Sequence, residues 1–161
     1  MQNLVKMDPQ QSLSLFAKFS TVVLRLALGL SFLSAIADRF GLWGAYGQPN
    51  VAWGDFARFL TYTAKLLWFL PVRSIAILAI VATGAEFILG ILLVLGWKTR
   101  MAALFSGVLL TFFALAMTIA LGVEAPLNYS VFSAAGGAFL LAICLENPFS
   151  VDRMQCPPAN R

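Results

Sequence analysis

The sequence contains no histidine and only two cysteines, Cys144 and Cys156, in 161 residues. Histidine is the commonest haem and metal ligand and the usual general base near neutral pH, so the chain itself lacks those groups. Two cysteines cannot complete a metal site by themselves. Gly-rich phosphate loops, nucleophile elbows and metal-ligand spacings are also absent from the sequence. The sequence therefore predicts no metal site, shows no cofactor-binding motif and contains no complete catalytic apparatus.

Charged residues are scarce as well. They make up 11% of the chain, against roughly a quarter in typical soluble proteins, whereas 60% of the residues are hydrophobic. A single soluble domain of this length could not bury so much apolar surface, so we expect a lipid bilayer around the protein. The formal net charge is +4. In membrane proteins such an excess of lysine and arginine usually lies in the cytoplasmic loops. No nucleic-acid partner is predicted from it.

Four apolar segments are long enough to cross the roughly 30 Å hydrocarbon core of a bilayer as helices. They cover about residues 19–37, 74–95, 101–121 and 127–145, and a polar tail follows at 146–161. Asp8 and Pro9 are typical of an N-cap and a first helical residue, so the first helix is expected to begin before the membrane. The sequence thus predicts an all-α fold, a transmembrane four-helix bundle formed by residues 1–161 as one domain.

Lysine and arginine are divided unevenly between the two sides of this bundle. Six lie in the N-terminal region, the second connection and the tail, and four lie in the first connection. The positive-inside rule therefore predicts that both termini are cytoplasmic and that the first connection is outside. Cys144 then lies near the cytoplasmic end of the fourth span, where a free cysteine is usually inert packing. Cys156 faces a reducing compartment, so no structural disulfide is expected.

The first connection, residues 38–73, has the features of a membrane-interface segment. Three of the four tryptophans lie in it: Trp43, Trp53 and Trp68. Apolar residues follow the helical period over about 55–70, with Asp55 as the expected N-cap and Pro71 as the expected end. We expect an additional amphipathic helix lying on the outer surface. It either anchors the bundle or forms a lid over an outward-facing pocket.

Two charges lie at membrane depth, Arg25 in the first span and Glu86 in the second. An unpaired ionisable group there costs several kcal/mol, and such residues mark function by default. Helical rise from Lys18 and Lys98 places Arg25 and Glu86 about 10 Å and about 18 Å from the cytoplasmic edge. A long arginine side chain can bridge this difference, so the sequence predicts an Arg25–Glu86 ion pair.

Glycines four residues after each charge support this pairing. Gly29 follows Arg25 and Gly90 follows Glu86 on the same helical face. The spacing predicts that Arg25 lies level with Gly90 and that Glu86 lies level with Gly29 where the two antiparallel helices touch. The pair is either a structural clip within the bundle or the polar floor of a cavity, in which Arg25 binds an anion or a carbonyl oxygen.

An outer mouth is a further candidate site. Asp38 and Arg39 end the first span, and Asn128, Tyr129 and Ser130 begin the fourth span on the same side. These residues could supply charges and hydrogen-bonding groups beside the tryptophans. The alternatives are that Asp38 and Arg39 are simply solvated and that Asn128 caps the fourth helix.

Three motifs in fixed order resemble a known family. The first span reads Arg25-x3-Gly29-x2-Phe32 and continues to Asp38-Arg39-Phe40-Gly41. The second reads Glu86-x3-Gly90-x2-Leu93-x2-Gly96 and continues to Lys98-Thr99-Arg100. The fourth opens with Ala125-Pro-Leu-Asn-Tyr-Ser-Val-Phe-Ser133. Over roughly Leu24 to Ala142 the chain resembles the DoxX/DoxD family of small four-helix membrane proteins of bacteria and archaea.

The resemblance implies respiratory or sulfur redox work at the cytoplasmic (inner) membrane. The DoxD branch is associated with thiosulfate:quinone oxidoreductase, in which a membrane subunit works with a second small subunit. A quinone would then enter from the lipid and an anionic sulfur compound from outside. On this reading Arg25 or Arg39 neutralises the anion, Glu86 passes protons and the aromatic residues contact the quinone.

Three classes of function follow from these observations. The chain is a catalytic subunit of a sulfur-compound:quinone oxidoreductase, a non-catalytic membrane scaffold of such a redox system, or a small transporter or lipid- or substrate-binding membrane protein without redox catalysis. Whether it is an enzyme stays open at this point. The expected partners are the bilayer and either a second small redox subunit or further copies of the chain.

Overall fold

The computed structural model describes residues 9–144 and 150–152 of the chain. The elements formed by these residues are all helices: α1 (Pro9–Arg39), α2 (Phe56–Leu66), α3 (Val72–Leu95), α4 (Thr99–Leu121), α5 (Glu124–Asn128) and α6 (Val131–Ile143). Helices α1, α3 and α4 are long and apolar enough to cross a membrane, and α6 is apolar but shorter. The prediction of an all-α fold is confirmed for this part of the chain.

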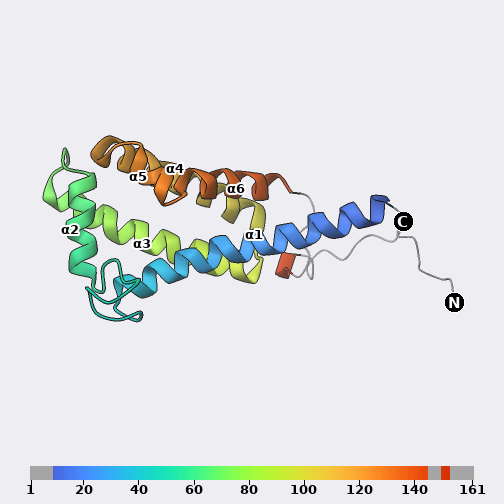
Figure 1. The fold of residues 1–161 in the computed structure, drawn as a ribbon, viewed down its shortest axis with the longest axis horizontal. Helices are drawn as coiled ribbons and strands as arrows, with labels where there is room; N and C mark the ends of the chain where they lie inside the picture. Colours follow the sequence, from blue (N-terminus) through green and yellow to red (C-terminus); the bar gives the residue numbers. More distant parts are fainter. Residues whose placement is uncertain (1–8, 145–149, 153–161) are drawn as a thin grey trace.

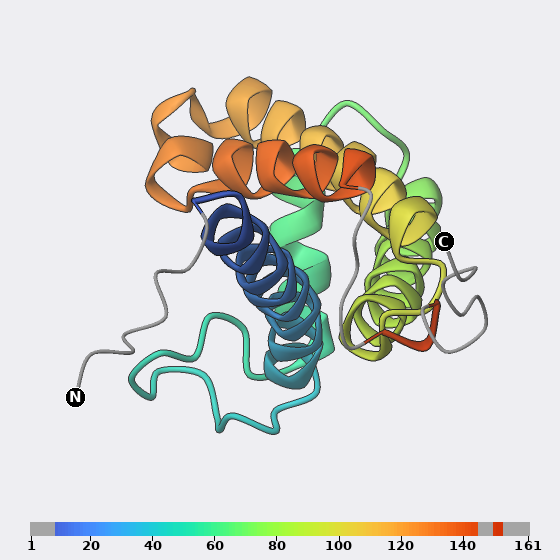
Figure 2. The ribbon, with the colours of Figure 1, turned by 90° about the vertical axis from the view of Figure 1, so that its right-hand side faces the viewer.

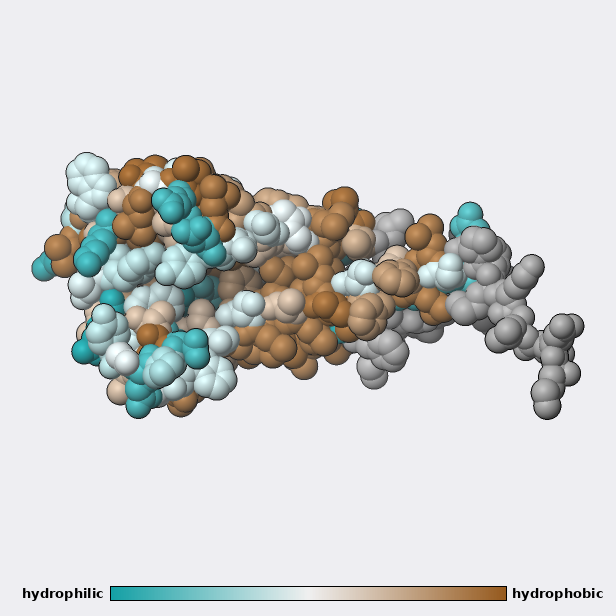
Figure 3. All heavy atoms as spheres, viewed as in Figure 1, coloured by the Kyte–Doolittle hydropathy of each residue, from teal (hydrophilic) through white to brown (hydrophobic). Residues whose placement is uncertain are grey.

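The four apolar helices form a bundle closed at one end by α2. Helix α1 packs on α3, α3 on α4, α4 on α6 and α6 back on α1 (Figures 1 and 2). Helix α2 runs across the end where α1 finishes and α3 begins. The turn from α3 to α4 lies at the opposite end, and α1 projects beyond it. Hydrophobic residues cover the length of the bundle in Figure 3, whereas polar residues gather at the α2 end.

Local signals set the ends of the long helices. Helix α1 begins at Pro9, as predicted, because the fixed φ of proline suits the first helical position. Helix α3 ends at Gly96 in a left-handed conformation, where Trp97 N–H donates to Leu92 O (3.0 Å) and Gly96 N–H to Leu93 O (3.2 Å). The predicted spans 74–95 and 101–121 therefore agree with α3 and α4 to within two residues.

The predicted fourth span, 127–145, is not one continuous helix. The chain first forms the short α5, and Ser130 then adopts a left-handed conformation (φ +55°) before α6 begins at Val131. The 13 residues of α6 extend about 20 Å, less than the hydrocarbon thickness that a single straight span covers. The predicted end of this span and most of the predicted tail, including Cys156, lie outside the described residues.

Helix α2 is shorter than predicted. The sequence predicts a helix over about 55–70, and the structure has one over Phe56–Leu66. The expected N-cap is confirmed, since the Asp55 carboxylate accepts a hydrogen bond from Arg58 N (2.8 Å). The helix ends early because the chain must reverse into α3, and Leu70 N–H donates to Leu67 O (2.9 Å) in the turn that reverses it. Phe59 and Thr63 are the buried residues of α2.

The core of the bundle lies where α1, α3, α4 and α6 meet. Small residues alternate with large ones there, which lets the helices approach closely. Its buried members are Leu28, Phe32, Leu89, Leu93, Ala102, Ala103, Ala138 and Leu141. The alanines come from α4 and α6.

Candidate functional site

The last residue of α1, Arg39, forms a buried ion pair with Glu86 in the middle of α3. Arg39 Nη2 donates to Glu86 Oε1 (3.0 Å), and Nη1 donates to Glu86 Oε2 and to Thr83 Oγ1 (2.9 Å). Each charged side chain is only 4% exposed. Glu86 and Thr83 are three residues apart and therefore share one face of α3. The guanidinium and the carboxylate thus neutralise each other inside the protein.

Aromatic residues cover the other side of the Arg39 guanidinium. Its Cζ lies 3.8 Å from the centre of the Phe59 ring and 5.4 Å from that of Trp53. The two rings meet edge to face, with centres 5.3 Å apart. Cations are attracted to ring faces, and the attraction is stronger away from water. Arg39, Glu86, Thr83, Phe59 and Trp53 are called the Arg39 cluster below.

Asp38, next to Arg39, holds the first connection in place. Its carboxylate accepts hydrogen bonds from the backbone N–H groups of Ala52 (3.1 Å), Trp53 (3.0 Å) and Gly54 (3.4 Å). Asp38 and Arg39 are 5% and 3% exposed. Neither is therefore solvated, and neither lines an open mouth. The prediction that these two charges form an outer mouth is wrong, because both bind other parts of the chain.

The predicted Arg25–Glu86 pair is also wrong. Glu86 pairs instead with Arg39, the last residue of α1. The Arg25 guanidinium lies against Gly96 at the far end of α3, ten residues from Glu86 and about 15 Å along the helix. Arg25 is 2% exposed. The two buried arginines of α1 thus serve opposite ends of the bundle.

Gly29 and Gly90 lie at the contact between α1 and α3, as predicted, but in a shifted register. A Cβ atom built on Gly29 lies 3.0 Å from Gly90 O, and one built on Gly90 lies 3.2 Å from Gly29 O. The two glycines therefore face each other directly, whereas the prediction set Arg25 level with Gly90. The helices are displaced by four residues, about one turn. This displacement explains why the depth count chose the wrong arginine.

The residues expected at the start of the fourth span do not join the Arg39 cluster. Asn128 ends α5 and does not cap α6, whose N-cap position is Ser130 and has no side-chain cap. Tyr129 and Ser130 are exposed, Tyr129 by 76%. Tyr129 is nevertheless near Tyr62 of α2. Burial raises the pKa of Tyr62, and the neighbouring Tyr129 raises it further.

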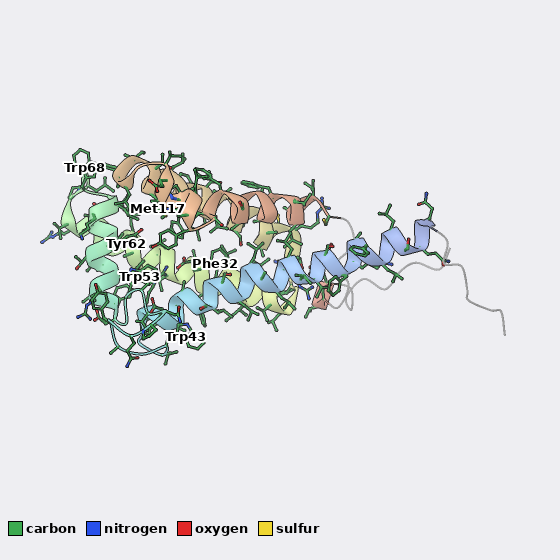
Figure 4. The ribbon with its side chains drawn as sticks, viewed as in Figure 1. Phe32, Trp43, Trp53, Tyr62, Trp68 and Met117 are labelled. Atoms are coloured by element: carbon green, nitrogen blue, oxygen red, sulfur yellow. The ribbon has the colours of Figure 1, made fainter. Side chains whose placement is uncertain are left out.

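The three tryptophans of the first connection have different environments (Figure 4). Trp53 belongs to the Arg39 cluster, near Tyr62. Trp43 is 59% exposed, and its indole N–H donates to Ser34 O (3.0 Å) and Ser34 Oγ (3.1 Å). Trp68 is 70% exposed in the turn before α3. Only Trp43 and Trp68 therefore present large surfaces outside the protein.

Comparisons with models of known families, with curated proteins and with solved structures found no match to this chain. The resemblance to the DoxX/DoxD family stays a prediction.

The candidate site contains two residues that the sequence alone did not select. Thr83 could have been found, because it lies one turn before Glu86 on the same face. Phe59 was expected on the apolar face of α2, but nothing in the sequence says that this face meets an arginine. Among the described residues, no group of three or more cysteine and carboxylate side chains is placed to hold a metal ion. Chemically, the Arg39 cluster pairs the guanidinium with a carboxylate, a hydroxyl and two aromatic rings, while Arg39 Nε is buried without a hydrogen-bond partner among the described residues.

Proposed function

We propose that the chain is an inner-membrane protein that serves as a scaffold subunit of a sulfur-compound redox system. The observation that supports a scaffold is the Arg39 cluster, in which Arg39 and Glu86 pair with each other and each side chain is only 4% exposed. Both oxygens of Glu86 accept hydrogen bonds from Arg39, and the Asp38 carboxylate accepts three from the first connection. These contacts join α1 to α3 and to the first connection, and the Phe59 ring over Arg39 adds α2.

A four-span topology accompanies this proposal. The stretch formed by α5 and α6 would complete the fourth crossing beside α4, and α2 would lie at the outer interface with Trp43 and Trp68 in the headgroup region. The exposed faces of α3 and α4 would contact lipid, since they carry many large apolar side chains. Both termini would be cytoplasmic by the positive-inside rule.

The redox part of the proposal is supported by the resemblance to the DoxX/DoxD family. In this arrangement a second small subunit carries the substrate chemistry, and a quinone reaches the complex laterally from the bilayer. The membrane chain supplies the docking platform and the lipid boundary.

The test is purification of the full chain from its native membrane in mild detergent. The proposal expects a stable companion protein, and quinone reduction on addition of thiosulfate only when that companion is present. Reduction by the isolated chain would replace the scaffold with a catalytic subunit. A bound small molecule with neither companion nor turnover would instead make the chain a transporter or binding protein.

A matched pair of variants sharpens the test. Glu86→Gln disrupts the Arg39 cluster, whereas Glu124→Gln changes an exposed carboxylate of α5. If the cluster builds the platform, Glu86→Gln releases the companion while Glu124→Gln keeps it. Equal retention by both variants would show that the companion binds elsewhere.

A further inference from the structure

Helix α4 begins without a cap of its own. Its N-cap residue is Lys98, which has a left-handed conformation (φ +47°) and supplies no side-chain hydrogen bond. Helices normally begin at serine, threonine, aspartate or asparagine, whose side chain accepts from the first free N–H groups. A non-glycine residue in the left-handed region is also strained. The start of α4 is therefore poorly specified by its own sequence.

The missing cap comes from the C-terminal segment, more than fifty residues later. Asp152 Oδ1 accepts a hydrogen bond from Lys98 N (2.6 Å), and Oδ2 accepts one from Thr99 N (2.8 Å). A carboxylate at this position also meets the positive end of the helix dipole. Asp152 thus performs for α4 the role that Asp55 performs for α2 from the adjacent position.

The same segment also packs on the end of α3. Asp152 N–H donates to Gly96 O (3.1 Å), and Ser150 is 4% exposed. A Cβ atom on Gly96 would lie 2.6 Å from Ser150 Cβ, so this glycine is needed both for its left-handed turn and for the close approach of Ser150. Figures 1 and 2 both show the red segment beside the α3–α4 turn.

Arg25 of α1 completes the junction. Its Nη1 lies against the position where a side chain on Gly96 would be, and the charge of Asp152 acts on it. One three-residue segment therefore meets the end of α3, the start of α4 and a buried arginine of α1. Arg100 of α4 also binds the end of α6, where its Nε donates a hydrogen bond to Ala142 O (3.2 Å).

We propose that Ser150–Asp152 is a latch that fixes the end of the bundle opposite α2. With Asp152 docked, the α3–α4 turn is held against α1 and the first N–H groups of α4 are capped. With Asp152 undocked, those N–H groups lose their acceptor and the turn opens. Whether Ser150–Asp152 is docked therefore affects the contacts of α1, α3 and α4 at this end. This inference does not depend on the proposed function.

Hydrogen exchange of the full chain in detergent or nanodiscs tests the latch. Asp152→Ala is expected to speed exchange in the segment 96–103 about tenfold, the effect of losing charge-assisted hydrogen bonds. Exchange in α2 and the first connection should not change. Glu124→Gln, which alters an exposed carboxylate in α5, is the matched control. Unchanged exchange at 96–103 in Asp152→Ala, or equal acceleration throughout the bundle, would overturn the proposal.

A second measurement covers the case in which Asp152→Ala does not fold. Ser150→Cys is made in a chain that also carries Cys144→Ser and Cys156→Ser, and thiol labelling is timed. Docking predicts slow labelling of the buried position and at least about tenfold faster labelling when Asp152→Asn is added, since the amide keeps only one of the two acceptors. Fast labelling without the second substitution would contradict the latch.

Discussion

At the residue scale, neighbouring charges of α1 have separate tasks. Asp38 binds the first connection and Arg39 binds α3, because successive helical residues point about 100° apart. A pair of charges at the end of an apolar segment is usually solvated. Nothing in the sequence contradicts that interpretation for Asp38 and Arg39. The structure instead buries both of them, and each is stabilised by partners far along the chain.

The Arg39–Glu86 pair leads to the first prediction. Glu86→Gln or Arg39→Gln leaves one buried charge without its partner, which costs about 3–5 kcal/mol of unfolding free energy. Arg58→Gln is the control, because Arg58 and Asp55 form an exposed pair whose loss costs about 1 kcal/mol or less. Reversible unfolding in mixed micelles measures both.

A double-mutant cycle identifies the partner of Glu86. Coupling with Arg39 should exceed about 2 kcal/mol, whereas coupling with Arg25, which lies at the far end of α3, should stay within about 0.5 kcal/mol. Strong coupling to Arg25 and none to Arg39 would refute the observed pairing.

Tyr62 leads to a prediction about pH. Its pKa is raised above the ordinary 10.0 by burial and by Tyr129, so folding favours the protonated phenol. The stabilisation from Tyr62 is therefore complete below pH 10.0 and is lost as the pH rises through the raised value. In an ultraviolet absorbance titration, Tyr62→Phe should remove a component that ionises above the ordinary range. Tyr46→Phe should leave that component in place, and the opposite result would reject this assignment.

At the element scale, the sequence predicts helices more securely than their interruptions. Helices α3 and α4 match their predicted spans because long apolar runs end at Gly96 and Gly122, which leave the helical conformation. The fourth span was predicted as continuous because it is mostly apolar and carries no charge. Nothing in that composition indicates the left-handed Ser130 that separates α5 from α6.

The contact between α1 and α3 leads to a prediction about glycine. Gly29→Ala places a Cβ 2.8 Å from Val94 Cγ2 and 3.0 Å from Gly90 O, which separates the helices and costs about 1–3 kcal/mol. Gly84 lies on α3 and has open space where its Cβ would be. Gly84→Ala should therefore be neutral or stabilise by up to about 1 kcal/mol, because alanine is the better helix former. Thermal unfolding compares the two, and equal losses would contradict the close contact at Gly29.

At the scale of the whole molecule, opposite ends of the bundle are fastened by different chemistry. The Arg39 cluster and Asp38 hold the end covered by α2, and Asp152 with Arg25 holds the α3–α4 turn. Helix α3 separates these ends by about 36 Å, more than the hydrocarbon thickness of a bilayer. The two sets of polar contacts meet α3 at Glu86 and Gly96, about 15 Å apart, and the core residues Leu89 and Leu93 lie between them.

Because α3 is long enough to cross a bilayer, we predict that positions at its two ends are labelled from different sides of the membrane in cells. Single cysteines are introduced as Ala45→Cys in the first connection or Trp97→Cys in the α3–α4 turn, with Cys144 and Cys156 replaced by serine. A membrane-impermeant maleimide should label Ala45→Cys in intact cells and Trp97→Cys only after permeabilisation, because the first connection is expected outside. Labelling of both positions from the same side would exclude a single crossing by α3.

The sequence by itself determined that this protein is helical and apolar, where α1 begins, where α3 and α4 end, and that Gly29 and Gly90 lie where α1 meets α3. These properties depend on hydropathy, helical period and local caps, which a short window of sequence contains. Only the tertiary structure decided that Glu86 pairs with Arg39 and that Asp152 caps α4. A one-turn displacement between packed helices moves a charge by about 5 Å, enough to change its partner, and no local pattern records it.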